Sequence, residues 1–431
     1  MIEHQIHIST IISTQRLDVP FFDGDIIKGK YMPLSKYVEI KGGKRVPKGE
    51  SFSQTPTNYL YLRLTDIEDF NNLDYTKLPY LSEEVYQKLK RYEIKEGELA
   101  FSIAGTIGQT FIVKNIPSGK KVILTENCAK LLIKDAQALS VDFLNILLQF
   151  DFIQNQIAKN RIQTTIPKIG LERIGKIQIP LLPALEQQKS YAAQYNNVVQ
   201  VLSNNKLECS LLLDEISDYI LSELHIKRNG DEVDKINKIN LSALIGNMFR
   251  LSDNQYRKSI EYPSLHLYDI AYIEKGKALS KKNIQQGDIP VIAGGQTSPY
   301  NHSVSNYDGN VITISASGAY AGYVWYHRTP IFASDCTVIH SKDESVFKTE
   351  YIYEVLKAQQ NSLYTLQRGA AQPHVYVKDL NNIFIPKVPI EKQEEIIQHV
   401  ENIRTHADQL LDEGNRNFEK VKQEIEKFII R

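Results

Sequence analysis

The sequence has few cysteines and no long apolar run. Its three cysteines, Cys128, Cys209 and Cys336, are far apart and form no C-x-x-C pair, which argues against a disulfide framework or a zinc site. No segment approaches the roughly 18 apolar residues of a membrane helix, and the first residues lack the basic and apolar regions of a secretory signal. We therefore expect a cytoplasmic protein with no metal site.

Net charge is absent as well, because 51 Lys and Arg balance 51 Asp and Glu. Neutrality is not typical of a chain that binds nucleic acid by itself. The charge is unevenly distributed, however: the parts that we predict to be globular are mildly basic, and the two predicted long helices are acidic. The acidic helix faces are equally consistent with solvation alone and with a binding role.

Catalytic signatures are also missing. The sequence contains no H-E-x-x-H metal site, no glycine-rich dinucleotide turn and no Asn-Pro-Pro-Tyr or Asp-Pro-Pro-Tyr signature of amino-methyltransferases. Its carboxylates form no recognisable constellation. The sequence therefore contains no recognisable active site.

What the chain does contain is one internal repeat, and each copy ends in the same pattern. Residues 177–188 read IQIPLLPALEQQ, and residues 383–394 read IFIPKVPIEKQE. At an offset of 206 residues the matching pairs are Ile177/Ile383, Ile179/Ile385, Pro180/Pro386, Pro183/Pro389 and Gln187/Gln393. A long duplication of this kind predicts two globular units, each followed by a long helix.

The copies also match before these patterns. Arg16–Asp18 resembles residues 250–252, residues 34–43 match 267–276, Gly105 matches Gly318, and Pro167 matches Pro373. The offset falls from 234 to 206 along the chain, so the first copy is longer by 28 residues. Most of the excess lies between about residues 66 and 97, a polar stretch that we predict to be a surface insertion.

Each copy mixes strand and helix signals. Residues 99–103 and 311–314 predict equivalent strands followed by glycine turns, and residues 323–326 predict a further strand. Helical periodicity covers residues 140–157 and 348–366. The predicted fold class is therefore α+β: two mixed α/β domains in tandem, covering residues 1–183 and 229–389, with long helices over residues 184–228 and 390–431.

The two long segments are free of proline, and their apolar residues alternate by three and four, which is typical of a coiled coil. Forty helical residues are about 60 Å long, and two equivalent helices can pair antiparallel about a pseudo-two-fold axis. Asn205 would then meet residues 410–414, where it either fixes the register or faces solvent. The predicted seam contains Tyr195, Val198, Leu202, Asn205, Leu212, Ile216, Val400, Ile403, Leu410, Val421 and Ile425, and ends at Phe428.

Polar and basic loops supply the remaining candidates. Basic side chains beside glycine turns can contact phosphates, and amide, hydroxyl and guanidinium groups can read base edges. In the first copy the candidates for DNA binding are Lys41, Lys44, Arg45, Lys48, Thr106, Gln109, Arg161, Gln163, Thr164 and Lys168. In the second copy they are Lys275, Lys277, Gln296, Thr297, Ser298, Tyr300, Tyr320, Arg368, Gln372 and His374.

The whole arrangement resembles the specificity subunit of type I restriction-modification systems. The resemblance rests most on residues 177–188 and 383–394, and it covers essentially the whole chain. It implies two target recognition domains, each of which reads one half of an interrupted sequence in double-stranded DNA, and a coiled coil that sets the gap. It also implies that this chain is non-catalytic and binds no cofactor of its own. Two docked modification subunits would use S-adenosylmethionine to methylate adenine.

The resemblance leaves open whether a restriction subunit, which uses ATP and Mg, accompanies the modification subunits. Two other functions also stay open. The chain could serve a related two-subunit restriction enzyme, or it could be a coiled-coil scaffold without a role in DNA binding. Basic loops at matching places in both copies argue against the scaffold.

Overall fold

The computed structural model describes residues 31–67, 73–160, 167–226, 259–369, 372–381 and 383–430. The chain divides into two compact units: Met1–Asn205 with Asp412–Arg431, and Lys206–Leu411. Each long helix therefore contributes one part to each unit. The matching segments Arg16–Asp18 and 250–252 lie outside the described residues, and the predicted domain boundaries stay a prediction.

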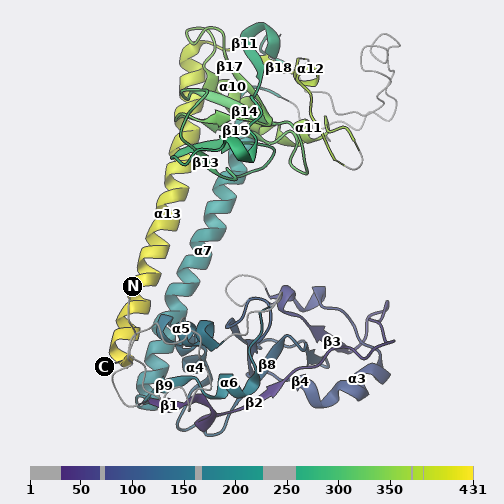
Figure 1. The fold of residues 1–431 in the computed structure, drawn as a ribbon, viewed down its shortest axis with the longest axis vertical. Helices are drawn as coiled ribbons and strands as arrows, with labels where there is room; N and C mark the ends of the chain where they lie inside the picture. Colours follow the sequence, from purple (N-terminus) through teal and green to yellow (C-terminus); the bar gives the residue numbers. More distant parts are fainter. Residues whose placement is uncertain are drawn as a thin grey trace. The chain divides into compact units, whose positions relative to one another are not determined.

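The first unit is built on an antiparallel sheet in the order β2-β8-β5-β6, of which Figure 1 labels β2 and β8. Its strands are β2 (Val38–Gly42), β8 (Cys128–Ile133), β5 (Leu99–Ser102) and β6 (Thr110–Ile112). A mixed sheet contains β3 (Tyr59–Leu62), β7 (Lys121–Leu124) and β4 (Glu93–Ile94), and β1 (Tyr31–Pro33) pairs with β9 (Gln178–Pro180).

Short helices of the first unit pack against these sheets. In the described residues they are α3 (Glu83–Leu89), α4 (Val141–Leu147), α5 (Asp151–Asn160) and α6 (Leu171–Gly175), with the 3-10 turns η1 (Leu34–Lys36), η2 (Leu64–Asp66), η4 (Tyr75–Lys77) and η5 (Lys90–Tyr92). The single helix predicted over residues 140–157 is wrong, because the chain turns between Leu147 and Asp151. Both helices still bury their apolar faces: Phe143 and Ile153 are fully buried in one core cluster.

The stretch between about residues 66 and 97, predicted to be a polar surface insertion, is not polar throughout. Helix α3 lies in this stretch and buries Val85, Tyr86 and Leu89 against Tyr61 and Ile123 of the mixed sheet. The apolar residues of α3 are spaced to fall on one face, so the segment has a core of its own. The charged residues that made it look polar lie on the opposite face.

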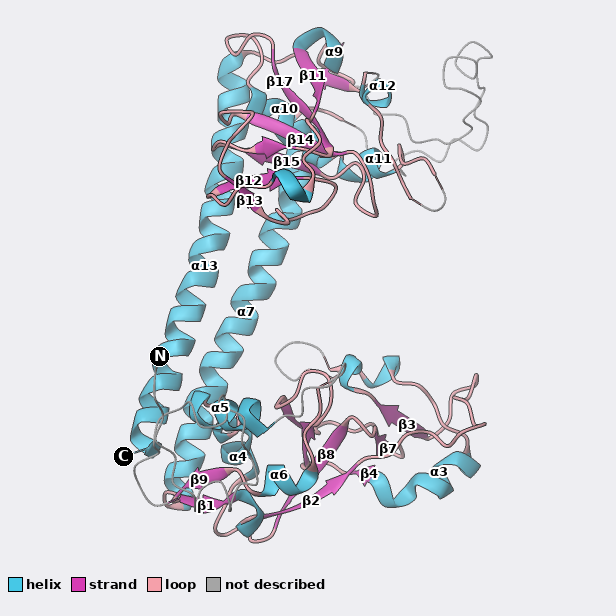
Figure 2. Ribbon diagram, viewed as in Figure 1, coloured by secondary structure: helices cyan, strands magenta, loops and turns pink. Residues whose placement is uncertain are grey.

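The second unit repeats this topology with the sheet order β11-β17-β14-β15 (Figure 2). Its strands are β10 (Ser264–His266), β11 (Ala271–Lys275), β12 (Ile289–Ile292), β13 (Asn301–His302), β14 (Val311–Ser315), β15 (Val324–His327), β16 (Phe332–Ala333), β17 (Cys336–Ser341) and β18 (Phe384–Pro386). Its short helices are α9 (Leu267–Ile270), η6 (Lys281–Asn283), α10 (Thr349–Ala358), α11 (Gln360–Tyr364) and α12 (Val377–Leu380). Again one predicted helix, over residues 348–366, is two.

The long helices are α7 (Leu185–Glu223) and α13 (Ile390–Ile430). In the first unit Tyr191 contacts Phe428 and Tyr195 contacts Phe418, with ring centroids 5.3 and 5.4 Å apart. In the second unit Tyr219 contacts His399, and Lys392 pairs with Glu223 at 2.6 Å. Partner numbers fall on α13 as they rise on α7, so the helices pack antiparallel within each unit.

The apolar seam lies close to the predicted positions. All eleven predicted seam residues are buried or half-buried. Asn205 is half-buried beside Gly414, where a Cβ would lie 3.1 Å from Asn205 Nδ2 and 2.9 Å from Leu202 Cδ1. Phe428, at the predicted end of the seam, contacts Tyr191 across the helix pair, but its side chain is 50% exposed. The neighbouring Ile425 and Ile429 are buried.

A buried glutamine fastens each long helix to its own unit. The amide of Gln188 accepts a hydrogen bond from Ser140 N at 2.9 Å and donates to the carbonyls of Ala138 and Pro183 at 2.9 and 2.8 Å. The amide of Gln393 likewise accepts from Lys348 N at 2.9 Å and donates to the carbonyls of Val346 and Val388 at 2.8 and 3.1 Å. Both side chains are fully buried.

These contacts correct one part of the sequence alignment. The structural equivalent of Gln393 is Gln188, and not the predicted Gln187, which is exposed. Likewise Pro183 corresponds to Val388 through the carbonyl that each offers to the glutamine. The alignment of the two copies shifts by one residue between Pro180 and the start of α7. The sequence comparison did not reveal this shift, because Gln187 and Gln188 are adjacent and either can be matched with Gln393.

Gln188 and Gln393, with their three hydrogen bonds each, act as clamps between a long helix and its unit. Removing a clamp should destabilise that unit. We expect Gln188→Ala and Gln393→Ala each to lower the free energy of unfolding by about 1–3 kcal/mol, because each leaves buried backbone groups without a partner. Thermal and denaturant unfolding measure the loss, and Gln187→Ala is the matched control with an exposed side chain. Equal stability of the three variants would contradict the clamp.

No helix within the described part of the chain is long and apolar enough to span a membrane. Those residues also contain no group of three His, Cys, Asp or Glu side chains that could hold a metal ion. The three cysteines are free and buried. Burial raises the pKa of the Cys128 and Cys336 thiols to about 12, so neither is a reactive thiolate.

Candidate nucleic-acid interface

In each unit a glycine turn lies against the segment that leads to the last strand of the domain. In the first unit Gly105 N donates to Pro167 O at 3.2 Å, and in the second Gly318 N donates to Pro373 O at 3.0 Å. Both glycines have positive φ, 76° and 86°, which favours glycine because it has no Cβ. The same hydrogen bond therefore holds matching loops together in the two copies.

The second unit gathers several predicted binding residues around its turn. His374 forms bridges with Ser317 and with Arg368. The loop that contains Gln296 and Thr297 joins the group, because Ser315 Oγ donates to Gly295 O at 3.1 Å. The side chains that this arrangement leaves exposed are those of Gln296, Thr297, Tyr320 and Gln372, and His374 is half-buried.

Two predicted residues of the second unit are engaged inside the protein. Ser298 Oγ donates to the carbonyls of Val291 and Tyr300 at 3.0 and 2.9 Å, so this hydroxyl shapes its loop. The guanidinium of Arg368 pairs with Asp379, whose side chain is only 6% exposed. For these two residues, the internal contacts favour a role in holding the loop. Tyr300 is half-buried, and its backbone carbonyl accepts the Ser298 hydrogen bond.

The first unit presents a smaller group at the equivalent place. Thr106, Gln109 and Lys168 are exposed. The turn is held by Ser102, whose hydroxyl accepts from Gln109 N at 3.0 Å and donates to Thr106 O. Arg161, Gln163 and Thr164 lie outside the described residues, directly before this segment.

Basic side chains lie at the ends of the equivalent strands β2 and β11 and in the loops that follow them. Lys41, Lys44, Arg45 and Lys48 are exposed in the first unit, and Lys275 and Lys277 in the second. Arg45 pairs with Glu126 at 2.5 Å, and this hydrogen bond raises the pKa of the guanidinium. Lys41 pairs with Glu39 at 3.0 Å. Exposed pairs of this kind contribute about 0–1 kcal/mol, so phosphate can replace the carboxylate at little cost.

A glycine after each of these strands sets the direction of the basic loop. Gly43 N donates to Cys128 O at 2.8 Å, and Gly276 N donates to Cys336 O at 2.8 Å. Both glycines lie so close to a neighbouring strand that a Cβ would meet backbone carbonyl oxygens at 2.0 Å and 2.3 Å. The basic loops thus start from equivalent points in the two units.

Comparison with known families agrees with this duplicated geometry. The family model described as "Type I restriction modification DNA specificity domain" matches residues 30–212 and again residues 261–415. The chain belongs to this family. Each match begins at the first described strand of its unit and continues into the long helix that follows, so each copy of the repeat is one specificity domain with its helix.

Solved structures of the family share the fold. The S subunit of a type I restriction-modification system from M. genitalium matches 95% of this chain and 96% of its own, with 16% identity and a TM-score of 0.50. A chain from a study of complex assembly and conformational transition of the type I R-M system matches over 94% and 98%, with 15% identity and a TM-score of 0.52.

Sequence reasoning missed residues of this specificity chain that act from beneath the loops. Asp379 holds the guanidinium of Arg368, and Asp335 accepts a hydrogen bond from the Ser317 hydroxyl. Asp379 also accepts a hydrogen bond from Tyr376 N at 3.4 Å, but the Tyr-x-x-Asp spacing is not the Ser/Thr-x-x-Glu/Gln signature of a capping box and did not point to it. Nothing local in the sequence pointed to Asp335.

Proposed function

We propose that this chain is the DNA-recognition subunit of a type I restriction-modification complex, and that each unit reads one half of an interrupted DNA target. One observation carries the proposal: the Gly105–Pro167 and Gly318–Pro373 hydrogen bonds hold two equivalent loop groups whose exposed side chains differ. Equivalent scaffolds with different side chains suit two readers of different sequences, because base contacts specify while phosphate contacts position.

The exposed side chains have the chemistry that base reading requires. In the first unit Lys168 and Gln109 offer a cation and an amide, and in the second Gln296 and Gln372 offer amides. Amides pair with adenine and cations with guanine in the major groove. The basic residues after β2 and β11 then contact phosphates, and the chain itself performs no catalysis.

The paired helices serve two purposes in this proposal. They connect the two units along the chain and so set the length of the gap, and they offer surface to two modification subunits. Those subunits bind S-adenosylmethionine, flip the target adenine and methylate it. A restriction subunit that uses ATP and Mg would join the same assembly through them.

Methylation mapping tests the proposal directly. The chain is co-expressed with the modification subunit of its neighbouring gene, and methylated adenines are mapped across the genome. We expect one interrupted motif that is methylated only when this chain is present. A stable complex without new methylation would favour the coiled-coil scaffold instead, and an uninterrupted motif would contradict two separate readers.

Matched variants then assign the half-sites. Lys168→Ala and Gln372→Ala remove exposed side chains at the equivalent loops of the two units. Each should reduce the discrimination against wrong bases in one half-site by about 1–3 kcal/mol, or roughly 5- to 150-fold. The other half-site should not change. Uniform loss of methylation at all sequences would instead assign the residue to phosphate contact.

A further inference from the structure

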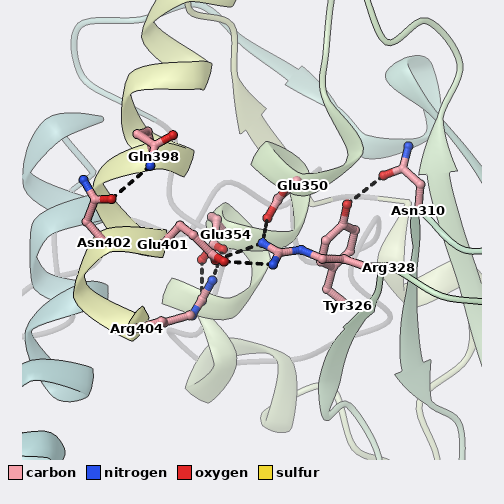
Figure 3. Close-up of polar contacts among 9 residues, drawn as sticks. All are labelled: Asn310, Tyr326, Arg328, Glu350, Glu354, Gln398, Glu401, Asn402 and Arg404. Carbon is pink, nitrogen blue, oxygen red and sulfur yellow. Dashed lines mark hydrogen bonds and ion pairs between the residues drawn. The ribbon is translucent and has the colours of Figure 1, made fainter. Parts of the chain in front are cut away.

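The second unit joins its domain to α13 through a cluster of charged side chains (Figure 3). Arg328, which directly follows β15, donates to both carboxylate oxygens of Glu401 on α13 at 2.9 Å. It also donates to Glu350 on α10 at 2.5 Å. One guanidinium therefore ties strand, short helix and long helix together.

A second pair lies beneath the first. Arg404 of α13 donates to both carboxylate oxygens of Glu354 on α10, at 2.5 and 2.9 Å. The Glu354 side chain is only 1% exposed, and burial raises the pKa of its carboxyl group. A forked pair of this kind is directional, because both hydrogen bonds are lost when the helices rotate or slide.

Aromatic rings hold the two arginines in place. Arg328 lies 5.9 Å above the ring of Tyr326, and Arg404 lies 5.6 Å above the ring of Tyr353. The two rings are stacked with centroids 5.3 Å apart. The cluster is therefore a packed unit of two fixed guanidinium groups between two elements of the domain and one helix.

The first unit has no such cluster at the matching place. Counted from the clamps Ser140–Gln188 and Lys348–Gln393, the equivalents of Glu354 and Arg404 are Ile146 and Val199. Ile146 is fully buried and Val199 half-buried, so an apolar contact replaces the buried ion pair.

The outer layer differs in the same way. Ser102 N donates to Gln109 O at 2.8 Å, and Ser315 N donates to Tyr323 O at 3.0 Å, so Gln109 and Tyr323 are equivalent. Counted along the chain from these two residues, Lys114 is the equivalent of Arg328. Lys114 reaches only Asp142, at 3.3 Å, and both side chains are exposed. Asn196 replaces Glu401, and together with Asn145 and Gln149 it lines an open groove of about 840 Å³.

We propose that the charged cluster is a positioning device that fixes the angle at which the second recognition domain is held on α13, so that it determines the permitted spacer and not the sequence of the half-site. This inference rests on the proposed function. Buried ion pairs contribute little net stability but can fix one arrangement among several. Apolar contacts, as in the first unit, tolerate small rotations.

The test replaces the buried ion pair of the second unit with the apolar pair found at the equivalent positions of the first unit. In the complex with the modification subunit, the double variant Glu354→Ile and Arg404→Val should methylate both original half-sites. Methylation at spacers one base pair longer or shorter should rise about tenfold relative to the native spacer. Arg404→Lys, which keeps the charge and loses the fork, should relax the spacer in the same direction without leaving a carboxylate unpaired.

Two further variants complete the test. Exchange of the partners, Glu354→Arg with Arg404→Glu, should restore the narrow spacer, and Lys114→Ala in the first unit should leave it unchanged. A native spacer preference in both the apolar double variant and Arg404→Lys would overturn the proposal, as would a loss of methylation that is uniform across spacers. If the unaltered complex methylates no interrupted motif, the proposed function itself fails.

Discussion

Deleting one heptad from each long helix should shorten the spacer of the methylated motif by about three base pairs and leave both half-sequences unchanged. The deletions are residues 203–209 of α7 and residues 408–414 of α13, which pack on neither domain core. Leu202 and Ala407 then take the positions of Cys209 and Gly414, so the apolar phase is kept. Seven helical residues are ~10 Å long, and base pairs are ~3.4 Å apart.

Methylation mapping of the shortened chain with its modification subunit measures this change. Methylation at the original spacer should fall at least about tenfold, since the two readers no longer engage both half-sites together. Deletion of four residues from each helix is the control, because it breaks the apolar phase and should unfold the pair. A shortened chain that keeps the original spacer would contradict the role of the helices in setting the gap.

Placing a methyl group on Gly276 should damage the second unit severely. In Gly276→Ala the new Cβ would lie 2.3 Å from Ser334 O, and in Gly43→Ala it would lie 2.0 Å from Thr125 O. Both carbonyls belong to backbone that is hydrogen-bonded to a neighbouring strand, from Thr125 N to Leu62 O at 3.1 Å and from Ser334 N to Ile292 O at 2.8 Å. Such backbone cannot move aside as a flexible side chain can. We therefore expect each variant to lose about 3 kcal/mol of unfolding free energy, with Tm lower by roughly 6–12 °C.

Gly42→Ala is the matched control, because its Cβ would meet only Leu171 Cδ1, at 3.4 Å. It should stay within about 1 kcal/mol of the unaltered chain, the ordinary range for glycine in a strand. Thermal unfolding compares the three. If Gly43→Ala were as stable as Gly42→Ala, the close approach of the strands at this point would be wrong.

Much of the fold follows from the duplication in the sequence. The repeated patterns around Pro180 and Pro386 predicted two units, each with a long helix, and both helices are present as α7 and α13. The strands near Leu99 and Val311 were predicted within one or two residues. Periodic signals of this kind are local: they can be recognised in consecutive residues without knowing which distant segment packs against them.

The sequence was less informative about contacts at a distance. The choice between Gln187 and Gln188 depends on which amide reaches Ser140 N, and adjacent identical residues carry no signal for that. The helix α3 was hidden in a charged stretch, because its apolar face is short. The ion pair between Arg368 and Asp379 could be recognised only in the folded protein, where the two side chains lie side by side.

The sequence by itself determined the number of units, the two long helices and the loops that contain the polar and basic residues. It did so because the internal repeat and the heptad spacing are local patterns of residues that recur along the chain. Only the tertiary structure decided which of those residues are free to bind and which hold the scaffold. It also revealed that Glu354 and Arg404 form a buried pair where the first unit has Ile146 and Val199. Burial and pairing depend on elements far apart in the chain, and these meet only in the folded protein.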